Sequence, residues 1–180
     1  MFNSGVPHPV IERVTSGARV ITTDHGSIHN KEGYSISGIF TAVANNTTVN
    51  YAFKTPTVAS GKYVHLKFLQ VGATANKVRV DLLEAPAAAP TLGTDLVAYN
   101  RNRIGTEVAS VMQAIKTGMT VNAAGAKTLE SKQFVLGDSR SLDIEWVLKP
   151  DTWYIRTFTN GTGGAADIDF FEFWYEEDMG

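Results

Sequence analysis

The 180-residue sequence contains no cysteine, which excludes disulfide bonds, thiolate metal ligands and a cysteine nucleophile. It lacks a strong excess of either charge, because 16 Lys and Arg stand against 18 Asp and Glu. No basic cluster of the kind that binds nucleic acid is present, so we expect no nucleic-acid partner. No apolar run approaches the about 20 residues that cross a bilayer. Residues 1–20 carry Pro7 and Pro9 without a long apolar stretch, so we expect neither an export signal nor a membrane partner.

Strand-like segments dominate the sequence from residue 34 onward. Val78, Val80 and Leu82 alternate with charged residues, which is the period of two of a strand with one buried face. The other predicted strands are residues 34–44, 49–54, 64–71, 142–148, 152–159 and 167–176. On the last strand Phe171, Phe173 and Tyr175 share one face, while the other face carries Ile168, Phe170 and Trp174 and is interrupted by Glu172. Apolar residues on both faces indicate a central strand or a subunit contact.

These segments predict an all-β fold, a jelly-roll-like antiparallel β-sandwich over residues 31–180. Most connections are expected to be hairpins, including one that joins the last two strands across a glycine-rich turn at 160–164. Residues 1–30 fit no strand pattern and predict an extended N-terminal arm. Residues 106–120 predict an irregular region that ends in a strand near 119–121. With 43% hydrophobic residues, the core needs no metal or cofactor to fold, and we expect none.

Some residues suggest metal or hydrolytic chemistry, each with a simpler alternative. His25 and His29 have the spacing of zinc ligands on a helix, but Gly26 and Ser27 argue against a helix there. The alternative is an arm or turn whose histidines hydrogen-bond locally. Two carboxylate pairs, Asp143 with Glu145 and Asp167 with Asp169, suit glycoside hydrolysis or calcium binding. Such pairs also occur on the solvated face of any amphipathic strand, so we expect no catalytic and no metal-binding residues.

Aromatic and basic residues suggest two further kinds of binding site. Four aromatic residues could form a sugar-stacking platform, although core packing is the usual role of alternating aromatics: Trp146, Trp153, Tyr154 and Trp174. Arg101 and Arg103 lie in the one local basic cluster, at residues 100–103. Guanidinium groups bind phosphate in two-point contacts, but loop arginines also form protein–protein ion pairs.

Short motifs follow one another in a characteristic order over residues 25–177. They lie at 25–33, 63–68, 80–85, 100–103, 137–141, 145–154 and 173–176. This series resembles the capsid decoration, or cement, proteins of tailed bacteriophages of the podophage type. Its most specific parts are Asn-Arg-Asn-Arg at 100–103, Glu-Trp-Val-Leu-Lys-Pro-Asp-Thr-Trp-Tyr at 145–154 and the terminal Trp-Tyr-Glu at 174–176. The alanine-rich loop between Pro86 and Pro90 departs from the pattern, and no catalytic residue is carried over.

The resemblance implies a non-enzymatic protein on the outer surface of an icosahedral capsid, made in the host cytoplasm. It would bridge neighbouring subunits of the major capsid protein, and it would form a homo-oligomer, a dimer or a trimer. Two other functions remain open from the sequence. One is a carbohydrate-binding jelly-roll module or a head or tail fibre domain. The other is a small hydrolase that uses one of the carboxylate pairs.

Overall fold

The computed structural model describes residues 10–14, 17–21, 23–74, 77–135, 140–161 and 163–178, with side chains described from residue 26 onward except at 140, 143 and 144. Its elements in chain order are β1 (Val10–Val14), β2 (Gly17–Ile21), α1 (Thr23–His29), β3 (Gly33–Val43), β4 (Thr48–Lys54), η1 (Val58–Ser60), β5 (Lys62–Ala73), β6 (Lys77–Glu84), β7 (Thr94–Asp95), β8 (Tyr99–Asn100), β9 (Ala114–Thr117), β10 (Lys127–Val135), β11 (Arg140–Leu148), β12 (Trp153–Asn160) and β13 (Ala166–Asp178).

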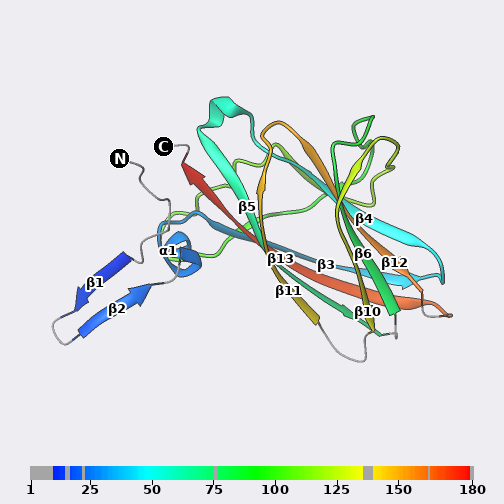
Figure 1. The fold of residues 1–180 in the computed structure, drawn as a ribbon, viewed down its shortest axis with the longest axis horizontal. Coiled ribbons are helices and arrows are strands. Elements are labelled where there is room, and N and C mark those ends of the chain that lie inside the picture. The colour runs from blue at the N-terminus through cyan, green and yellow to red at the C-terminus, as the bar shows by residue number, and fades with distance from the viewer. Residues whose placement is uncertain are drawn as a thin grey trace.

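Two antiparallel sheets pack face to face, which confirms the all-β, jelly-roll-like sandwich (Figure 1). One sheet has six strands in the order β10-β6-β12-β4-β9-β7, and the other has five in the order β11-β5-β13-β3-β8. The strands β1 and β2 form a separate two-stranded sheet, drawn apart from the sandwich beside α1 in Figure 1. The apolar faces of the two large sheets are buried against each other, as in other β-sandwiches.

Most long strands connect to a strand of the opposite sheet, so the prediction that hairpins dominate is wrong. The strands β3 to β6 alternate between the two sheets, and so do β10 to β13. The predicted hairpin of the last two strands is therefore also wrong, since β12 pairs with β4 and β6 while β13 pairs with β3 and β5. Asn160 fixes this crossing because its side-chain amide donates to the carbonyls of Val43 and Gly164. A glycine-rich turn does not specify which sheet receives the next strand.

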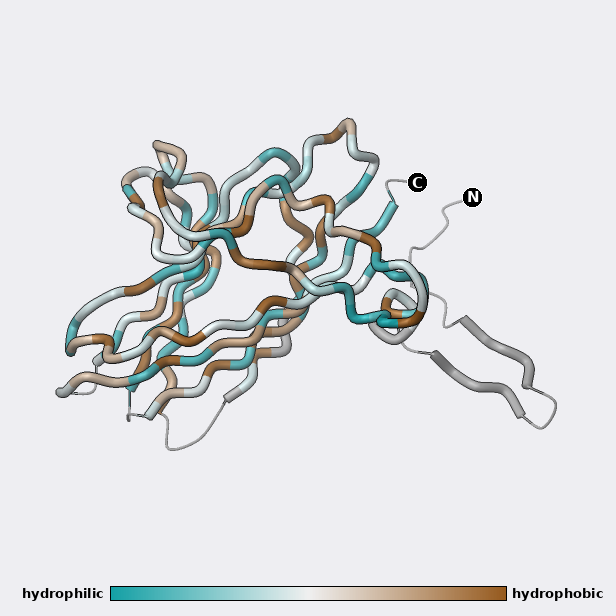
Figure 2. Tube along the Cα trace, turned by 180° about the vertical axis from the view of Figure 1, so that it is seen from behind, coloured by the Kyte–Doolittle hydropathy of each residue, from teal (hydrophilic) through white to brown (hydrophobic). Residues whose placement is uncertain are grey.

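The main core lies between the sheets and is rich in aromatic rings. Tyr51 stacks on Phe170 at a centroid distance of 4.6 Å, and Phe158 lies 5.5 Å from Phe170. These rings come from β4, β12 and β13, so they join the two layers directly. Figure 2 shows apolar and polar residues alternating along the strands, as one buried face per strand requires. Offset ring contacts of this kind add to the stability gained from apolar burial.

The predicted central position of the last strand is confirmed, because β13 lies in the middle of the five-stranded sheet. The prediction that Gly26 and Ser27 prevent a helix at 25–29 is wrong, since α1 spans Thr23–His29. This short helix packs against β3 and β13, and Ile28 lies within contact distance of Gly33. Tertiary packing of this kind overrides the low helix propensity of Gly26.

Candidate functional site

A group of ionisable side chains lies inside the sandwich: Glu130, Arg156, Glu172 and Tyr51. We call this group the core charge cluster. The Arg156 guanidinium donates to Glu130 Oε2 at 3.1 Å and to Glu172 Oε1 at 2.7 Å, and the Tyr51 hydroxyl bonds to Glu172 Oε2. Glu130 and Arg156 both pair with Leu82 in the ladder, and Arg156 also pairs with Tyr51. Three members therefore form one row across the six-stranded sheet, while Glu172 reaches them from the five-stranded sheet.

The cluster is almost completely withdrawn from water. The side chains of Arg156 and Glu172 are 0% and 1% exposed. Burial raises the pKa of Glu172 well above its usual range. Burial also lowers the pKa of Arg156, and Glu130 opposes this by attraction and hydrogen bonding. A neutral cluster is the cheapest state in an apolar interior, so we infer that Glu172 holds a proton while Arg156 and Glu130 form the ion pair.

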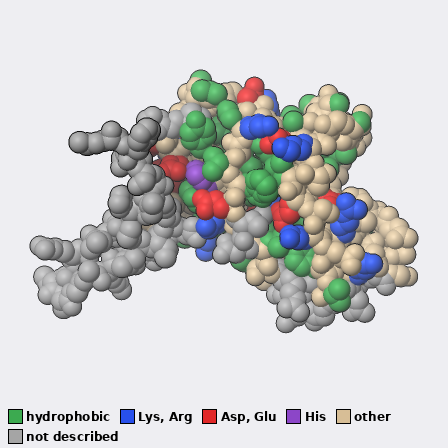
Figure 3. Space-filling model, in the orientation of Figure 1, with side chains coloured by type: hydrophobic (Ala, Val, Ile, Leu, Met, Phe, Trp, Pro, Cys, Tyr) green, Lys and Arg blue, Asp and Glu red, His purple; other side chains and the backbone are tan. Residues whose placement is uncertain are grey.

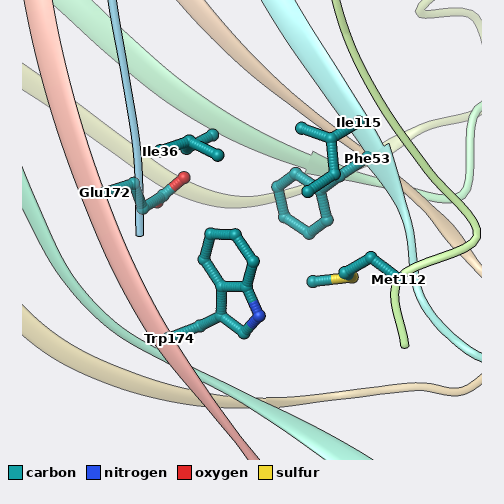
Figure 4. A pocket seen from close by; sticks show the side chains of 6 residues that line it. All are labelled: Ile36, Phe53, Met112, Ile115, Glu172 and Trp174. Atoms are coloured by element: carbon teal, nitrogen blue, oxygen red, sulfur yellow. The ribbon is translucent and has the colours of Figure 1, made fainter. Parts of the chain in front are cut away.

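The cavity beside this cluster is too small for a substrate. Glu172 lines it together with apolar side chains from both sheets and from the segment before β9 (Figure 4): Ile36, Phe53, Met112, Ile115 and Trp174. Its volume is about 10 Å³, enough for a single water molecule. The converging ionisable groups thus hold the two sheets together, and they do not face a space that could admit a ligand.

Two of the four carboxylates singled out in the sequence, Glu145 and Asp167, are engaged in hydrogen bonds to protein groups. Glu145 accepts from the Tyr175 hydroxyl at 2.5 Å and from Lys67 Nζ at 3.2 Å. The Tyr175 bond is the main reason why the pKa of Glu145 is lowered. Asp167 Oδ1 accepts from the backbone N–H of Ala42 at 2.7 Å, and Asp169 is exposed on the same strand.

Glu145 belongs to a network on the outer face of the five-stranded sheet. His65 lies 3.3 Å from Glu145 and 3.0 Å from Glu177, and its ring stacks on Tyr175 at 4.5 Å. Figure 3 shows a histidine among acidic side chains on one face of the molecule. The side chain of Asp143 lies outside the described residues, so the pairing of Asp143 with Glu145 stays a prediction.

The structure also locates the other predicted residues. His29 ends α1, while the side chain of His25 lies outside the described part. Among the described residues, no three His, Cys, Asp or Glu side chains lie close enough to hold a metal ion. Of the aromatic residues, Trp174 and Tyr154 are buried in the core, whereas Trp146 and Trp153 are half-buried and pack against core clusters. These four residues therefore do not form an exposed platform.

The Asn-Arg-Asn-Arg segment shapes a loop. Asn100 is buried and donates to the carbonyls of Lys31 and Val108, while its own oxygen accepts from the N–H of Asn102. Arg101 lies 4.8 Å above the ring of Phe173, and Arg103 pairs with Glu107 at 2.8 Å. The asparagines therefore fix the backbone, and both arginines lie at the surface with protein partners.

The segment between residues 92 and 108, here called the apolar segment, is unusually rich in exposed apolar side chains. The described residues expose ten large apolar side chains, and five of them lie in this segment. They are Leu92, Val97, Tyr99, Ile104 and Val108. Ile104 is 80% exposed and Val97 is 63% exposed. Single exposed apolar residues are ordinary, whereas several within one short segment make that segment a candidate contact region.

Polar side chains hold the apolar segment and the residues that follow it in place. Lys31 Nζ donates to the carbonyl of Thr106 at 3.0 Å, and Asn102 donates to the carbonyl of His29 at 2.9 Å. Just beyond the segment, the buried Glu176 accepts from Ser110 Oγ, from the N–H of Val111 and from Trp174 Nε1. Side-chain hydrogen bonds thus hold the backbone of this stretch at several points, while five of its large apolar side chains are exposed.

Sequence reasoning missed the core charge cluster and the apolar segment. The interruption of an apolar face at Glu172 was a visible signal, and Arg156 between Tyr154 and Phe158 was a second one. Among the described residues, no helix is long and apolar enough to span a bilayer. No protein-family model matches the chain, and no curated protein matches it.

Proposed function

We propose that this chain is a non-enzymatic structural protein that binds other protein surfaces in a larger assembly, as a capsid decoration protein does. The observation that carries the proposal is the apolar segment, in which Val97, Tyr99 and Ile104 face solvent from a backbone fixed by buried polar groups. Holding exposed apolar groups rigid prepares them for contact, since less conformational entropy is lost on binding.

The composition of the apolar segment suits a protein partner. Tyrosine and arginine are enriched at the energetic centres of protein interfaces, and Tyr99, Arg101 and Arg103 supply both types here. Apolar side chains with charged neighbours match the usual pattern of an interface, an apolar centre with a polar rim. A sandwich whose sheets are joined by the core charge cluster gives this surface a stiff support.

The resemblance to phage decoration proteins supplies the identity of the partner in this proposal. The major capsid protein presents the same site many times on a shell, so even weak contacts add up through multivalent attachment. Bridging neighbouring capsid subunits from outside would add bonds that oppose the internal pressure of packaged DNA. A homo-oligomer would match the local symmetry of such a shell.

Particles assembled without this protein provide the direct test. Release of DNA on heating, followed with an intercalating dye, is expected at a lower temperature for these particles, and added protein should restore the higher temperature. Ile104→Ser is expected to weaken binding to the particles by at least about 10-fold, as for an interface residue worth more than about 1.4 kcal/mol.

Val58→Ser is the matched control, because Val58 is 64% exposed but lies in η1, outside the apolar segment. Both variants should keep the wild-type melting temperature, since neither removes a buried side chain. Equal heat resistance with and without the protein would end the decoration proposal. Binding that is equally insensitive to Ile104→Ser and Val58→Ser would exclude the apolar segment as the contact.

A further inference from the structure

The strand β11 forms an outer edge of the five-stranded sheet, with no strand beyond it in the part of the chain that the structure describes. It pairs with β5 on one side, and the sheet order ends there. Backbone N–H and C=O groups along such an edge can pair with a strand from another chain. The strand is nine residues long, so it offers more ladder positions than the two-residue edge strands β7 and β8.

Lysines protect the other long edge but not this one. The edge strand β10 carries exposed Lys127 and Lys132, and charged side chains of this kind discourage strand addition. The strand β11 contains no lysine, and Val147 near its end is 59% exposed. Both edges have one irregularity in their ladders, and both carry charged residues, since β11 contains Arg140, Asp143 and Glu145. The two edges therefore differ in lysine content and not in the presence of charge. Because lysine is the charged residue most often used to guard an edge, the edge of β11 is the more receptive one.

The same chain contains a two-stranded element that, among the described residues, pairs with no strand of either large sheet. The strands β1 and β2 pair with each other in a sheet of two strands, and Figure 1 draws this hairpin apart from the sandwich. A two-stranded hairpin alone is at best marginally stable in water, and further strands are needed for stability. Five of its ten strand residues are valine or isoleucine, so water is a poor environment for it.

We propose that the β1–β2 hairpin of one copy adds to the β11 edge of a second copy and extends its five-stranded sheet. The formal charges of the two elements are complementary. The hairpin carries two arginines and one glutamate, a net charge of +1. The strand β11 carries one arginine and two acidic residues, a net charge of −1.

The fold favours a second copy over the same chain. One residue separates Ile21 at the end of β2 from Thr23 at the start of α1, and α1 packs on β3 and β13. The hairpin forms a sheet of its own and does not pair with the β11 edge of the same chain, and Figure 1 draws it apart from that edge. The edge of a neighbour imposes no such restraint. Reciprocal exchange gives a closed dimer, and cyclic exchange gives a closed trimer.

The purified full-length protein tests this directly by light scattering after size-exclusion chromatography, without any particle. A closed oligomer is expected, together with slow amide hydrogen exchange along β11. Val147→Lys should raise the dissociation constant at least about 10-fold by placing a lysine on the edge. Ile11→Pro in β1 should have the same effect by breaking the hairpin ladder.

Val135→Lys is the matched control, because Val135 is 70% exposed on β10, and this variant should keep the wild-type oligomer. A monomer at all concentrations overturns the proposal, whether or not β11 is protected from exchange. An oligomer that Val147→Lys and Ile11→Pro leave unchanged overturns it as well. Because no particle is involved, failure here leaves the decoration proposal to its own test.

Discussion

Replacing Arg156 with methionine is expected to lower the free energy of unfolding by about 3–5 kcal/mol, the usual cost of removing one partner from a buried ion pair. Arg156 lies between Glu130 and Glu172 and is 0% exposed. Without the guanidinium, the Glu130 carboxylate loses its cation in an apolar interior, and Glu172 loses a hydrogen-bond donor. The loss should be measured by urea unfolding at several pH values, and it should grow as the pH rises, because Glu130, which is ionised beside Arg156 in the wild type, then needs a proton to stay buried.

Glu172→Gln is the informative counterpart of Arg156→Met. The pKa of Glu172 is raised by burial, so the folded protein binds this proton more tightly than the unfolded chain does. The resulting stability is fully present below the ordinary glutamate pKa of about 4.3 and is lost as the pH rises through the raised value. Glu172→Gln should therefore cost less than about 1 kcal/mol at neutral pH and flatten this pH dependence, since it keeps the Arg156–Glu130 pair intact. A loss equal to that of Arg156→Met would show that Glu172 is ionised.

Glu176→Ala is expected to cost about 2–4 kcal/mol, because it leaves buried donors without an acceptor. The carboxylate of Glu176 accepts from Val111, from Ser110 and from Trp174 Nε1, and Glu176 is 2% exposed. Removing it should also loosen the backbone that follows the apolar segment. Hydrogen exchange of the amides at 109–112 should therefore become faster, and urea unfolding should report the overall loss.

The isosteric variant Glu176→Gln separates the hydrogen bonds from the charge. Its one acceptor oxygen can keep part of the network, so the expected loss is about half that of the alanine variant. If the amides at 109–112 exchange as slowly in Glu176→Ala as in the wild type, then Glu176 does not hold this stretch.

The alternation of apolar and polar residues predicted the strands well but not their partners. The pattern at 77–83 became β6, and the two-faced apolar strand took a central place as β13. The strand β10 was missed because its inward position 130 is a glutamate, which hides the alternation. Pairing between sheets depends on contacts far apart in the sequence, and a glycine-rich turn such as 160–164 fits a hairpin and a crossing equally well.

The candidate site was less predictable because its residues gain their roles only in three dimensions. Arg156 looks like an outward-facing charge until its neighbours Tyr154 and Phe158 are seen to face the core with it. Residues 106–120 were expected to end in a strand near 119–121, whereas β9 ends at Thr117 and Gly118 follows with a positive φ of 64°. The apolar segment is held by hydrogen bonds from Lys31 and Asn102 to carbonyl groups far away in the sequence. No local sequence pattern predicts such contacts.

Cryo-electron microscopy of intact particles carrying this protein tests the central claim most directly. We predict density for the sandwich on the outer surface of the capsid, with the apolar segment around Val97 and Ile104 against the major capsid protein. Density confined to the tail, or an apolar segment that faces solvent on the bound protein, would contradict this account.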